Sequence, residues 1–314
     1  MSERETIVVV TRKTALEELV LRLNSRAQAR FYLEQNGVSF DEYERADTQY
    51  HRAVEALVAQ LPRGVKQVRL DRELLPTYQF GARDLVVTIG PDGLVINVAK
   101  YLDGQPIFAV NPDPGRIDGV LLPFTVADTG AWISRALRGH VAFTQVSMAR
   151  AELNDGQMLD AVNDLFIGAR THVSARYQIA LGERSERQSS SGIVVSTGAG
   201  CTGWLSAIVG GACRIAQQFG ADHAAPSGSA LALGWGSERL WYAVREPFVS
   251  RTSQATLVFG QLEDGQELVL TSEMPENGAI FSDGIEADYL AFNAGSIARI
   301  GLSARKAHLL VRGK

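Results

Sequence analysis

Apolar positions follow two different spacings along the chain, and in the first half they predict strands and helices in alternation. Ile7–Val10 is a continuous apolar run typical of a buried strand. The next apolar residues repeat at intervals of three and four, as in an amphipathic helix, at Leu16, Leu19, Val20 and Leu23. A second helix with this spacing, through Val54, Leu57, Val58 and Leu61, is predicted to end at Pro62 and Gly64. Further elements are predicted around Val68 and at Leu85–Ile89, Leu94–Leu102 and Ile107–Val110, an order typical of an α/β domain.

The second half instead has segments in which apolar and polar residues alternate. Arg176–Ala180, Ala255–Phe259 and Glu267–Leu270 have the period of two expected of strands, and Asp264-Gly265 is typical of a hairpin turn. The pattern changes near Pro123–Gly130, where we expect a domain boundary. The chain is therefore predicted to have an α/β domain followed by a β-rich domain.

Composition narrows the classes of function. With 314 residues, 46% of them hydrophobic, the chain can bury two moderate cores. A net charge of -4 gives no long-range attraction for nucleic acid or an anionic membrane. Two cysteines, Cys201 and Cys213, are too few for a disulfide framework, which favours a reducing compartment. The polar start has no pattern of a signal peptide, transit peptide or membrane span, so we expect a soluble, cytoplasmic protein that binds neither nucleic acid nor membrane.

Leu85–Val98 (LVVTIGPDGLVINV) permits two interpretations. Pro-Asp-Gly between two apolar runs favours a hairpin turn when the local pattern is considered alone. The alternative is a strand, a loop and a helix whose first turn offers backbone N–H groups to a phosphate. In that alternative Asp92 stands at the carboxyl end of the strand, where open α/β sheets bind ligands.

Gly192–Ser206 (GIVVSTGAGCTGWLS) contains a GxGxxG pattern, formed by Gly198, Gly200 and Gly203. The dinucleotide-binding fingerprint also needs an acidic residue at the end of a second strand, and the candidate Asp222 follows a segment that is not a buried strand. From the pattern alone, a structural glycine turn and a ligand-binding loop are equally supported.

Two shorter segments contain polar groups that could bind a ligand. Asn163-Asp164 lies inside an apolar run, where an unpaired polar group costs about 1–3 kcal/mol, so the pair either caps a turn or has a partner. Ser282-Asp283-Gly284 has the composition of an ordinary turn. The five histidines have no metal-ligand spacing, and no metal held by side chains is predicted. The GxSxG and Walker A motifs of serine hydrolases and P-loop NTPases are absent.

Taken in order, these four segments resemble the NAD kinase superfamily. That family has a strand followed by GGDGT, then an Asn-Glu pair, a TxTGSTAY-type loop and Ser-x-Asp-Gly. This chain has GPDGL at 90–94, Asn163-Asp164, TGAGCTGW at 197–204 and Ser282-Asp283-Gly284. It is most similar to the branch typified by animal mitochondrial NAD kinase, through AVNPDPGR at 109–116, NDLFIG at 163–168, SSGIVVST at 190–197 and VREP at 244–247. The resemblance covers nearly the whole chain and favours strand–loop–helix for Leu85–Val98.

The resemblance implies a Rossmann-like nucleotide-binding α/β domain at 1–125, completed by about 295–314, and a dinucleotide-binding β-sandwich domain at 126–294. It implies transfer of a phosphoryl group from ATP, with Mg²⁺, to the adenosine-ribose 2′-hydroxyl of NAD, by a homodimer or larger homo-oligomer. Asp92 matches the acidic residue thought to take the hydroxyl proton. The matches to cofactor-binding residues are Gly90, Gly93, Asn111, Thr197, Gly198 and Gly200. The matches to residues that bind the NAD substrate are Asn163, Asp164, Thr202, Gly203, Trp204 and Asp283.

Three departures from the family pattern keep other functions open. Pro91 replaces a glycine and has no backbone N–H, and Leu94 replaces a threonine and has no hydroxyl, so two possible phosphate contacts are lost. Asp164 is one methylene shorter than the family's glutamate. A weak or inactive homologue that binds NAD(H) as a sensor is therefore the alternative, and an NAD-dependent dehydrogenase built on the glycine loop is a third interpretation.

Overall fold

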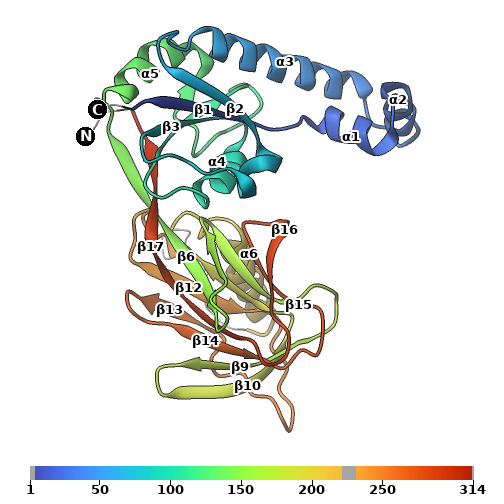
Figure 1. The fold of residues 1–314 in the computed structure, drawn as a ribbon. Coiled ribbons are helices and arrows are strands. Elements are labelled where there is room, and N and C mark those ends of the chain that lie inside the picture. Colours follow the sequence, from blue (N-terminus) through green and yellow to red (C-terminus); the bar gives the residue numbers. More distant parts are fainter. Residues whose placement is uncertain (1–3, 221–230, 313–314) are drawn as a thin grey trace. The chain divides into compact units, whose positions relative to one another are not determined.

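The computed structural model describes residues 4–220 and 231–312, which divide into two compact units (Figure 1). Unit 1 comprises Met1–Thr144 and His308–Lys314, and unit 2 comprises Gln145–Ala307. The sequence predicts that the chain leaves unit 1 near residue 125 and returns to it near residue 295. Both crossings come later in the structure because they fall within two long strands, β6 (Phe143–Leu153) and β17 (Ile297–Leu310), that continue from one unit into the other.

Unit 1 is built on a parallel sheet with the strand order β2–β1–β3–β4. Its strands are β1 (Thr6–Thr11), β2 (Lys66–Asp71), β3 (Asp84–Ile89) and β4 (Pro106–Asn111). Every residue of β3 and β4 is buried, as expected of central strands covered on both faces. The short β5 (Phe124–Thr125) and the last residues of β17 pair with β4, both in parallel.

Helices cover both faces of this sheet (Figure 1). α3 (Phe40–Ala59) and α5 (Thr129–Leu137) pack on one face, where Leu57 and Ile133 are fully buried against the strands. α4 (Asp92–Ala99) lies on the other side. Two 3₁₀ turns, Arg72–Thr77 and Val126–Asp128, complete the unit.

α1 (Ala15–Leu23), α2 (Arg26–Gln35) and the start of α3 form a second, smaller core around Leu16, Leu33 and Phe40. Thr14 begins α1 with a capping box, and Asn24, at φ 63°, ends it in the left-handed conformation. The apolar spacing predicted α1 and the end of α3 but gave no indication of α2.

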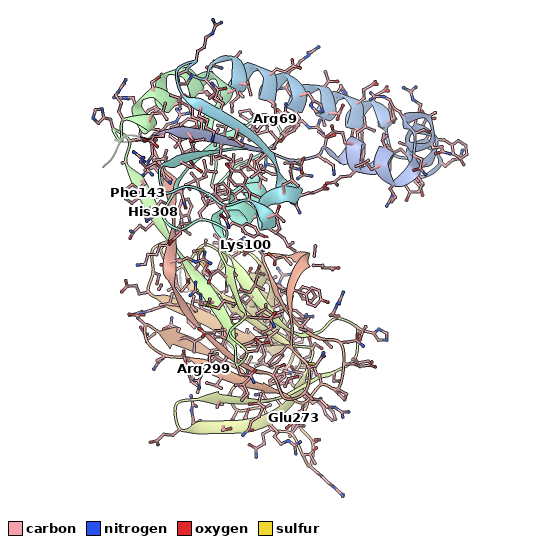
Figure 2. All side chains as sticks on the ribbon, in the orientation of Figure 1. Arg69, Lys100, Phe143, Glu273, Arg299 and His308 are labelled. Carbon is pink, nitrogen blue, oxygen red and sulfur yellow. The ribbon has the colours of Figure 1, made fainter. Side chains whose placement is uncertain are left out.

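The end of β17 completes unit 1 by returning to its sheet. His308 pairs with Pro106 of β4, and its ring nitrogen Nδ1 lies 3.0 Å from the backbone oxygen of Gly104. The same ring stacks on Phe143 at a centroid distance of 4.7 Å (Figure 2). The first residue of β6 and the last residues of β17 therefore belong to the packing of unit 1.

Unit 2 consists of two antiparallel sheets packed face to face. One has the order β10–β9–β14–β17, with β6 on β17 and β7 on β6, from strands β7 (Met158–Ala161), β9 (Ala175–Leu181), β10 (Arg184–Ser190) and β14 (Leu268–Ser272). The other has the order β13–β12–β11–β8–β15–β16, from strands β8 (Asp164–Ala169), β11 (Ile193–Ser196), β12 (Arg239–Val244), β13 (Phe259–Glu263), β15 (Gly278–Ser282) and β16 (Ile285–Ala291).

Side chains of both sheets meet in one core, for example Ile167 and Val195 from one sheet and Tyr177 and Leu270 from the other. α6 (Trp204–Gln218) packs on β12. The predicted α/β domain and β-sandwich are confirmed. No helix within the described ranges, 4–220 and 231–312, is long and apolar enough to cross a membrane.

Three local predictions from the apolar pattern are wrong. Ala255–Phe259 is not a strand, because the backbone N–H groups of Thr256 and Leu257 donate to the carboxylate of Glu186 (both 2.9 Å), and β13 begins only at Phe259. Asp264-Gly265 does form a turn, but the strands that it joins, β13 and β14, belong to different sheets and make no hairpin. The hairpin favoured for Leu85–Val98 is instead β3, a loop and α4, as the family resemblance implied.

Candidate functional site

The loop between β3 and α4 has little room around its first glycine. A Cβ at Gly90 would lie 2.9 Å from Cδ2 of Leu94, whose side chain is buried. Pro91 directly precedes the helix and provides no N–H there. Gly93 is exposed, and a Cβ at this position would have no atom within 4 Å, so packing does not require glycine.

Asp92 is the first residue of α4, and backbone groups hold its carboxylate. Oδ1 accepts a hydrogen bond from the N–H of Leu121 (2.8 Å), and Oδ2 accepts one from the N–H of Val120 (3.2 Å). Both bonds fix the direction of the carboxylate at the carboxyl end of β3. Each oxygen keeps a further lone pair that can accept a proton or a hydrogen bond.

Asn111, at the end of β4, shapes the segment that carries these two donors. Its Nδ2 donates to the backbone oxygen of Ile117 (2.8 Å), and its Oδ1 accepts from the N–H of Asp113 (2.9 Å). Gly119 has φ 66°, and a Cβ there would lie 2.8 Å from Nδ2 of Asn111. The Asn111 amide therefore folds the loop that positions Asp92.

A cavity of about 380 Å³ lies within unit 1, at loops that follow β1, β3 and β4. Open α/β sheets bind ligands at the carboxyl ends of their strands. Six charged side chains line it, namely the cations Arg12, Lys13 and Arg116 and the carboxylates Asp113, Glu42 and Asp47. The guanidinium groups in this wall can pair with an anionic group such as a phosphate chain.

In unit 2, Asp283 joins segments that are far apart in the sequence. Its carboxylate accepts hydrogen bonds from the backbone N–H groups of Val162 (3.0 Å), Asn163 (2.7 Å) and Asp164 (3.2 Å). Its own N–H donates to the oxygen of Asp164 (2.9 Å). Asp283 adopts the left-handed φ of 55° in the turn between β15 and β16. The Ser-Asp-Gly turn thus holds the Asn163-Asp164 pair at the start of β8.

Thr197 attaches the glycine loop to the same segment. Its N–H donates to the oxygen of Asn163 (2.9 Å), and its hydroxyl accepts from the N–H of Gly200 (3.3 Å). A Cβ at Gly200 would lie 2.3 Å from the oxygen of Asn163, and one at Gly198 would lie 2.1 Å from the oxygen of Gly234. Glycine is required at both positions because backbone passes so close.

The carboxyl group of Asp164 lies in a desolvated position. Burial raises the pKa of Asp164 from 3.8 to about 7, the negative charge of Asp283 raises it as well, and the Ser196 hydroxyl opposes them. Its Oδ1 is buried and has no hydrogen-bond partner among the described residues. A buried polar atom without a partner is costly, so a ligand hydroxyl that bonded to it would be favoured.

Trp204, the first residue of α6, is 40% exposed and therefore does not fill the core. Its ring stacks on Phe166 at a centroid distance of 5.6 Å, and the guanidinium of Arg245 lies 5.4 Å from the ring centroid. Phe166 follows Asp164 by two residues on β8 and stacks in turn with Phe281 (6.3 Å). An aromatic surface thus begins on the strand that carries Asp164.

The structure brings most of the predicted residues of unit 2 into one cluster, namely Asn163, Asp164, Thr197, Gly200 and Asp283. Thr202 and Gly203 are exposed just before α6, and Gly198 packs against Gly234. In unit 1, Gly90 lies in the loop that follows β3, and Asp92 begins α4 two residues later. Asp222 lies outside the described residues.

Sequence reasoning missed four contributors, Phe166, Ser196, Arg245 and the Val120–Leu121 pair. Phe166 could have been found from the alternation along β8, because it falls on the same face as Asp164. Val120 and Leu121 donate through their backbone N–H groups, so their side-chain types give no indication of this role.

The fold is that of NAD kinases. Yeast NADH kinase complexed with NADH matches with a TM-score of 0.57 at 13% identity, covering 99% of this chain and 84% of that chain. An NAD kinase from Archaeoglobus fulgidus in complex with ATP matches with a TM-score of 0.54 at 15% identity, covering 97% and 92%.

Sequence comparison indicates the same group. A probable NADH kinase of Oryza sativa subsp. japonica is 25% identical over 218 residues, which are 64% of this chain and 63% of that protein. An NAD kinase of Thermococcus sibiricus is 32% identical over 127 residues, or 38% and 44%. The matched region spans less than two thirds of each relative. No model of a protein family matches the chain. The relatives and the fold together support the NAD kinase superfamily.

Proposed function

We propose that this protein is a phosphotransferase that acts on the adenosine-ribose 2′-hydroxyl of NAD or NADH. The observation that carries the proposal is the cluster around Asp283, whose carboxylate binds backbone N–H groups about 120 residues away at Asn163-Asp164. The Thr197 loop is bonded to the same pair. The three segments that resemble the superfamily in this half of the chain are thus one structural unit.

In the proposed reaction the 2′-oxygen attacks the γ-phosphorus of ATP. The new O–P bond forms as the bond to the bridging oxygen breaks, ADP leaves, and the hydroxyl proton passes to the carboxylate of Asp92. The N–H groups that hold this carboxylate leave it a lone pair for the proton.

The dinucleotide is proposed to bind to unit 2. Asn163 and Asp164 hold its hydroxyl groups, and Oδ1 of Asp164 gains a hydrogen-bond partner, which none of the described residues gives it. Thr202 and Gly203 lie along the ligand, and the exposed face of Trp204 gives a flat surface to a base. These roles follow the order of the family motifs and the exposure of each residue.

ATP is proposed to place its phosphates in the cavity of unit 1, where Arg12 and Arg116 offer positive charge beside Lys13, whose ammonium is paired with Glu73. Mg²⁺ would accompany the nucleotide and neutralise charge on its phosphates. Asp113, in the same wall, is an oxygen donor of the kind that Mg²⁺ prefers.

A second candidate, a homologue that binds NAD(H) with little or no catalysis, is favoured by the GPDGL loop. Pro91 supplies no N–H to a phosphate, and Leu94 is buried with its side chain against Gly90. Phosphoryl transfer depends on positioning and charge stabilisation, so these losses affect turnover more than dinucleotide binding.

The closer likeness through AVNPDPGR and NDLFIG leads us to propose kinship with the branch typified by animal mitochondrial NAD kinase. We also propose a homodimer or larger homo-oligomer that works in the cytoplasm. Sedimentation velocity measures the oligomeric state, and fractionation of cells that produce the protein measures its location.

The deciding experiment measures phosphorylated product from NAD and from NADH, with ATP and Mg²⁺ or with polyphosphate. Asp92→Asn should lower turnover by about a hundredfold or more while calorimetry shows similar NAD affinity. Asp103→Asn, at an exposed position in the same unit, is the matched control and should leave turnover unchanged. Binding of NAD without product from any donor supports the second candidate, and failure to bind at millimolar NAD contradicts both.

A further inference from the structure

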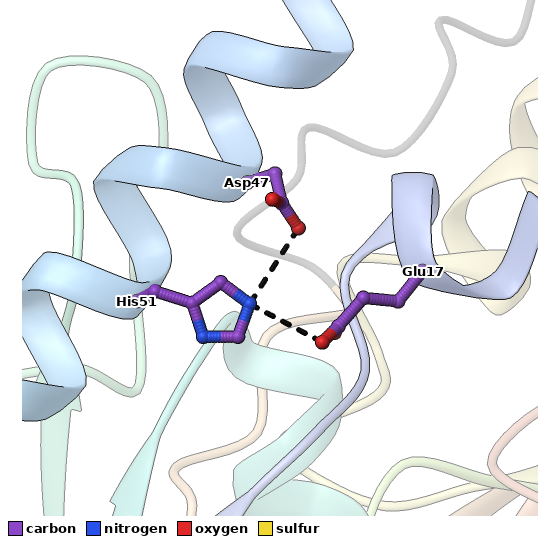
Figure 3. A group of neighbouring side chains, drawn as sticks. All are labelled: Glu17, Asp47 and His51. Atoms are coloured by element: carbon purple, nitrogen blue, oxygen red, sulfur yellow. Dashed lines mark ion pairs between the residues drawn. The ribbon is translucent and has the colours of Figure 1, made fainter. Parts of the chain in front are cut away.

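Three side chains from two helices of unit 1 converge on one point, next to the cavity that one of them, Asp47, also lines. Glu17 comes from α1, and Asp47 and His51 come from α3 (Figure 3). One atom that could bind a metal from each residue lies within 4.8 Å of the other two. We propose that these three side chains bind a divalent transition-metal ion, with Zn²⁺ as the ion that fits the donors best.

The distances between the donor atoms fit such an ion. His51 Nε2 lies 3.2 Å from Oε1 of Glu17 and 3.6 Å from Oδ1 of Asp47. In a tetrahedral zinc site with bonds of about 2.0 Å, neighbouring ligand atoms are about 3.3 Å apart. The observed separations lie on both sides of this value, so an ion can enter with small side-chain movements.

His51 brings a single proton to two carboxylates. One imidazole nitrogen carries at most one proton, which it donates to one acceptor or shares more weakly between two. Here two carboxylate oxygens, from Glu17 and Asp47, face the same nitrogen of His51. A cation at the common point attracts all three donors at once.

The ligands are placed by the helices before any ion arrives. Asp47 and His51 are four residues apart on α3 and therefore lie on one face of it. The N–H of Thr14 donates to Oε2 of Glu17 (2.7 Å), and the Thr14 hydroxyl donates to Oδ1 of Asp47 (2.5 Å). Such hydrogen bonds orient metal ligands and raise affinity, because less ordering is left to do on binding.

Charge and accessibility also favour a cation. The nearby ammonium of Lys13 lies 2.5 Å from Glu73, its main partner, and is also attracted by Glu17, and the guanidinium of Arg26 lies 2.5 Å from Glu44. The side chains of Glu17 and His51 are 39% and 41% exposed, which leaves room for water as a fourth ligand. An imidazole with two carboxylates suits Zn²⁺, whereas Mg²⁺ prefers a set of oxygens only.

The consequence of binding would be a cross-link between α1 and α3. α1 has nine residues, and the small core that it shares with α2 and α3 holds five buried side chains. An ion held by both helices adds its binding free energy to the stability of this region. The proposal does not depend on the nucleotide chemistry.

Calorimetry of the full chain with ZnCl₂ tests the site, with MgCl₂ at the same concentrations as the comparison. We expect one Zn²⁺ per chain, at least about tenfold weaker binding in His51→Gln and in Asp47→Asn, and no Mg²⁺ binding in this range. His172→Gln, at an exposed histidine of unit 2, is the control and should bind zinc as the unchanged protein does. In ¹⁵N NMR, zinc should shift the ring nitrogens of His51 and leave those of His172 in place.

Equal zinc affinity in His51→Gln, Asp47→Asn and the unchanged protein would overturn the proposal, as would no binding at millimolar Zn²⁺. Circular dichroism of each variant reports whether it folds. A His51 ring whose NMR signals ignore excess zinc in the unchanged protein overturns the proposal without any variant.

Discussion

Replacing Asp164 by asparagine should change how the stability of the protein depends on pH. Burial raises the pKa of Asp164 from 3.8 to about 7, so the folded state holds this proton more tightly than the unfolded chain does. Between about pH 4 and 7 the unfolded chain releases the proton first, and the folded state is therefore progressively destabilised as the pH rises. Above pH 7 the folded state is destabilised by the full free-energy cost of burying the ionised Asp164 carboxylate, about 4 kcal/mol at most.

Asparagine has a similar shape and no charge to desolvate, so Asp164→Asn should be the more stable protein at high pH. From pH 5 to pH 8, the difference in free energy of unfolding between Asp164→Asn and the unchanged protein should increase by at most about 3 kcal/mol. Urea unfolding followed by circular dichroism at several pH values measures this change. Glu276→Gln, at an exposed position of unit 2, is the control and should show no such growth. An advantage that stays constant within about 0.5 kcal/mol across this range would show that the Asp164 carboxyl does not titrate as described.

Further substitutions test the loops. Gly200→Ala puts a Cβ 2.3 Å from a backbone oxygen and should destabilise unit 2 by a few kcal/mol and weaken NAD binding. Gly211→Ala, at an exposed position of α6 where a Cβ has no atom within 4 Å, is the control and should do neither. Urea unfolding and calorimetry measure both effects. Trp204→Leu should abolish quenching of tryptophan fluorescence by NAD with the fold intact, and unchanged quenching would exclude the ring as a ligand contact. If the protein is a weak kinase, Pro91→Gly alone should raise turnover. Adding Leu94→Thr should lower the free energy of unfolding by about 1–3 kcal/mol, because the leucine is buried. Equal turnover of Pro91→Gly and the unchanged protein would show that the proline does not cause the low activity.

The β3–α4 loop shows where a local pattern stops being informative. Pro-Asp-Gly between apolar runs has the composition of a hairpin turn, and nothing within Leu85–Val98 excludes one. The second run forms the helix α4, whose residues are buried on several sides, as Leu94, Val95 and Val98 show. An amphipathic pattern cannot reveal a helix that is covered almost all round. The order of motifs along the whole chain was needed to predict it.

Asp283 shows the opposite case, in which the local prediction was correct and incomplete. The segment does form a turn, with Asp283 and Gly284 in the left-handed region. Its wider role depends on three N–H groups about 120 residues away, and backbone donors have no signature in composition. Glu17, Asp47 and His51 were missed for a related reason, because α1 and α3 bring them together only in the folded chain.

The path of the chain through β17 has a consequence for synthesis on the ribosome. Unit 2 is a continuous insertion, residues 145–307, within a unit 1 that is complete only when the segment from His308 is made. Until then the stretch of β4 at Pro106–Ile107 lacks its last partner, and an unpaired strand edge can recruit strands from other chains. A nascent or truncated chain that stops before His308 therefore carries a folded sandwich beside an open sheet. Such fragments should depend on chaperones and aggregate more readily than the full chain.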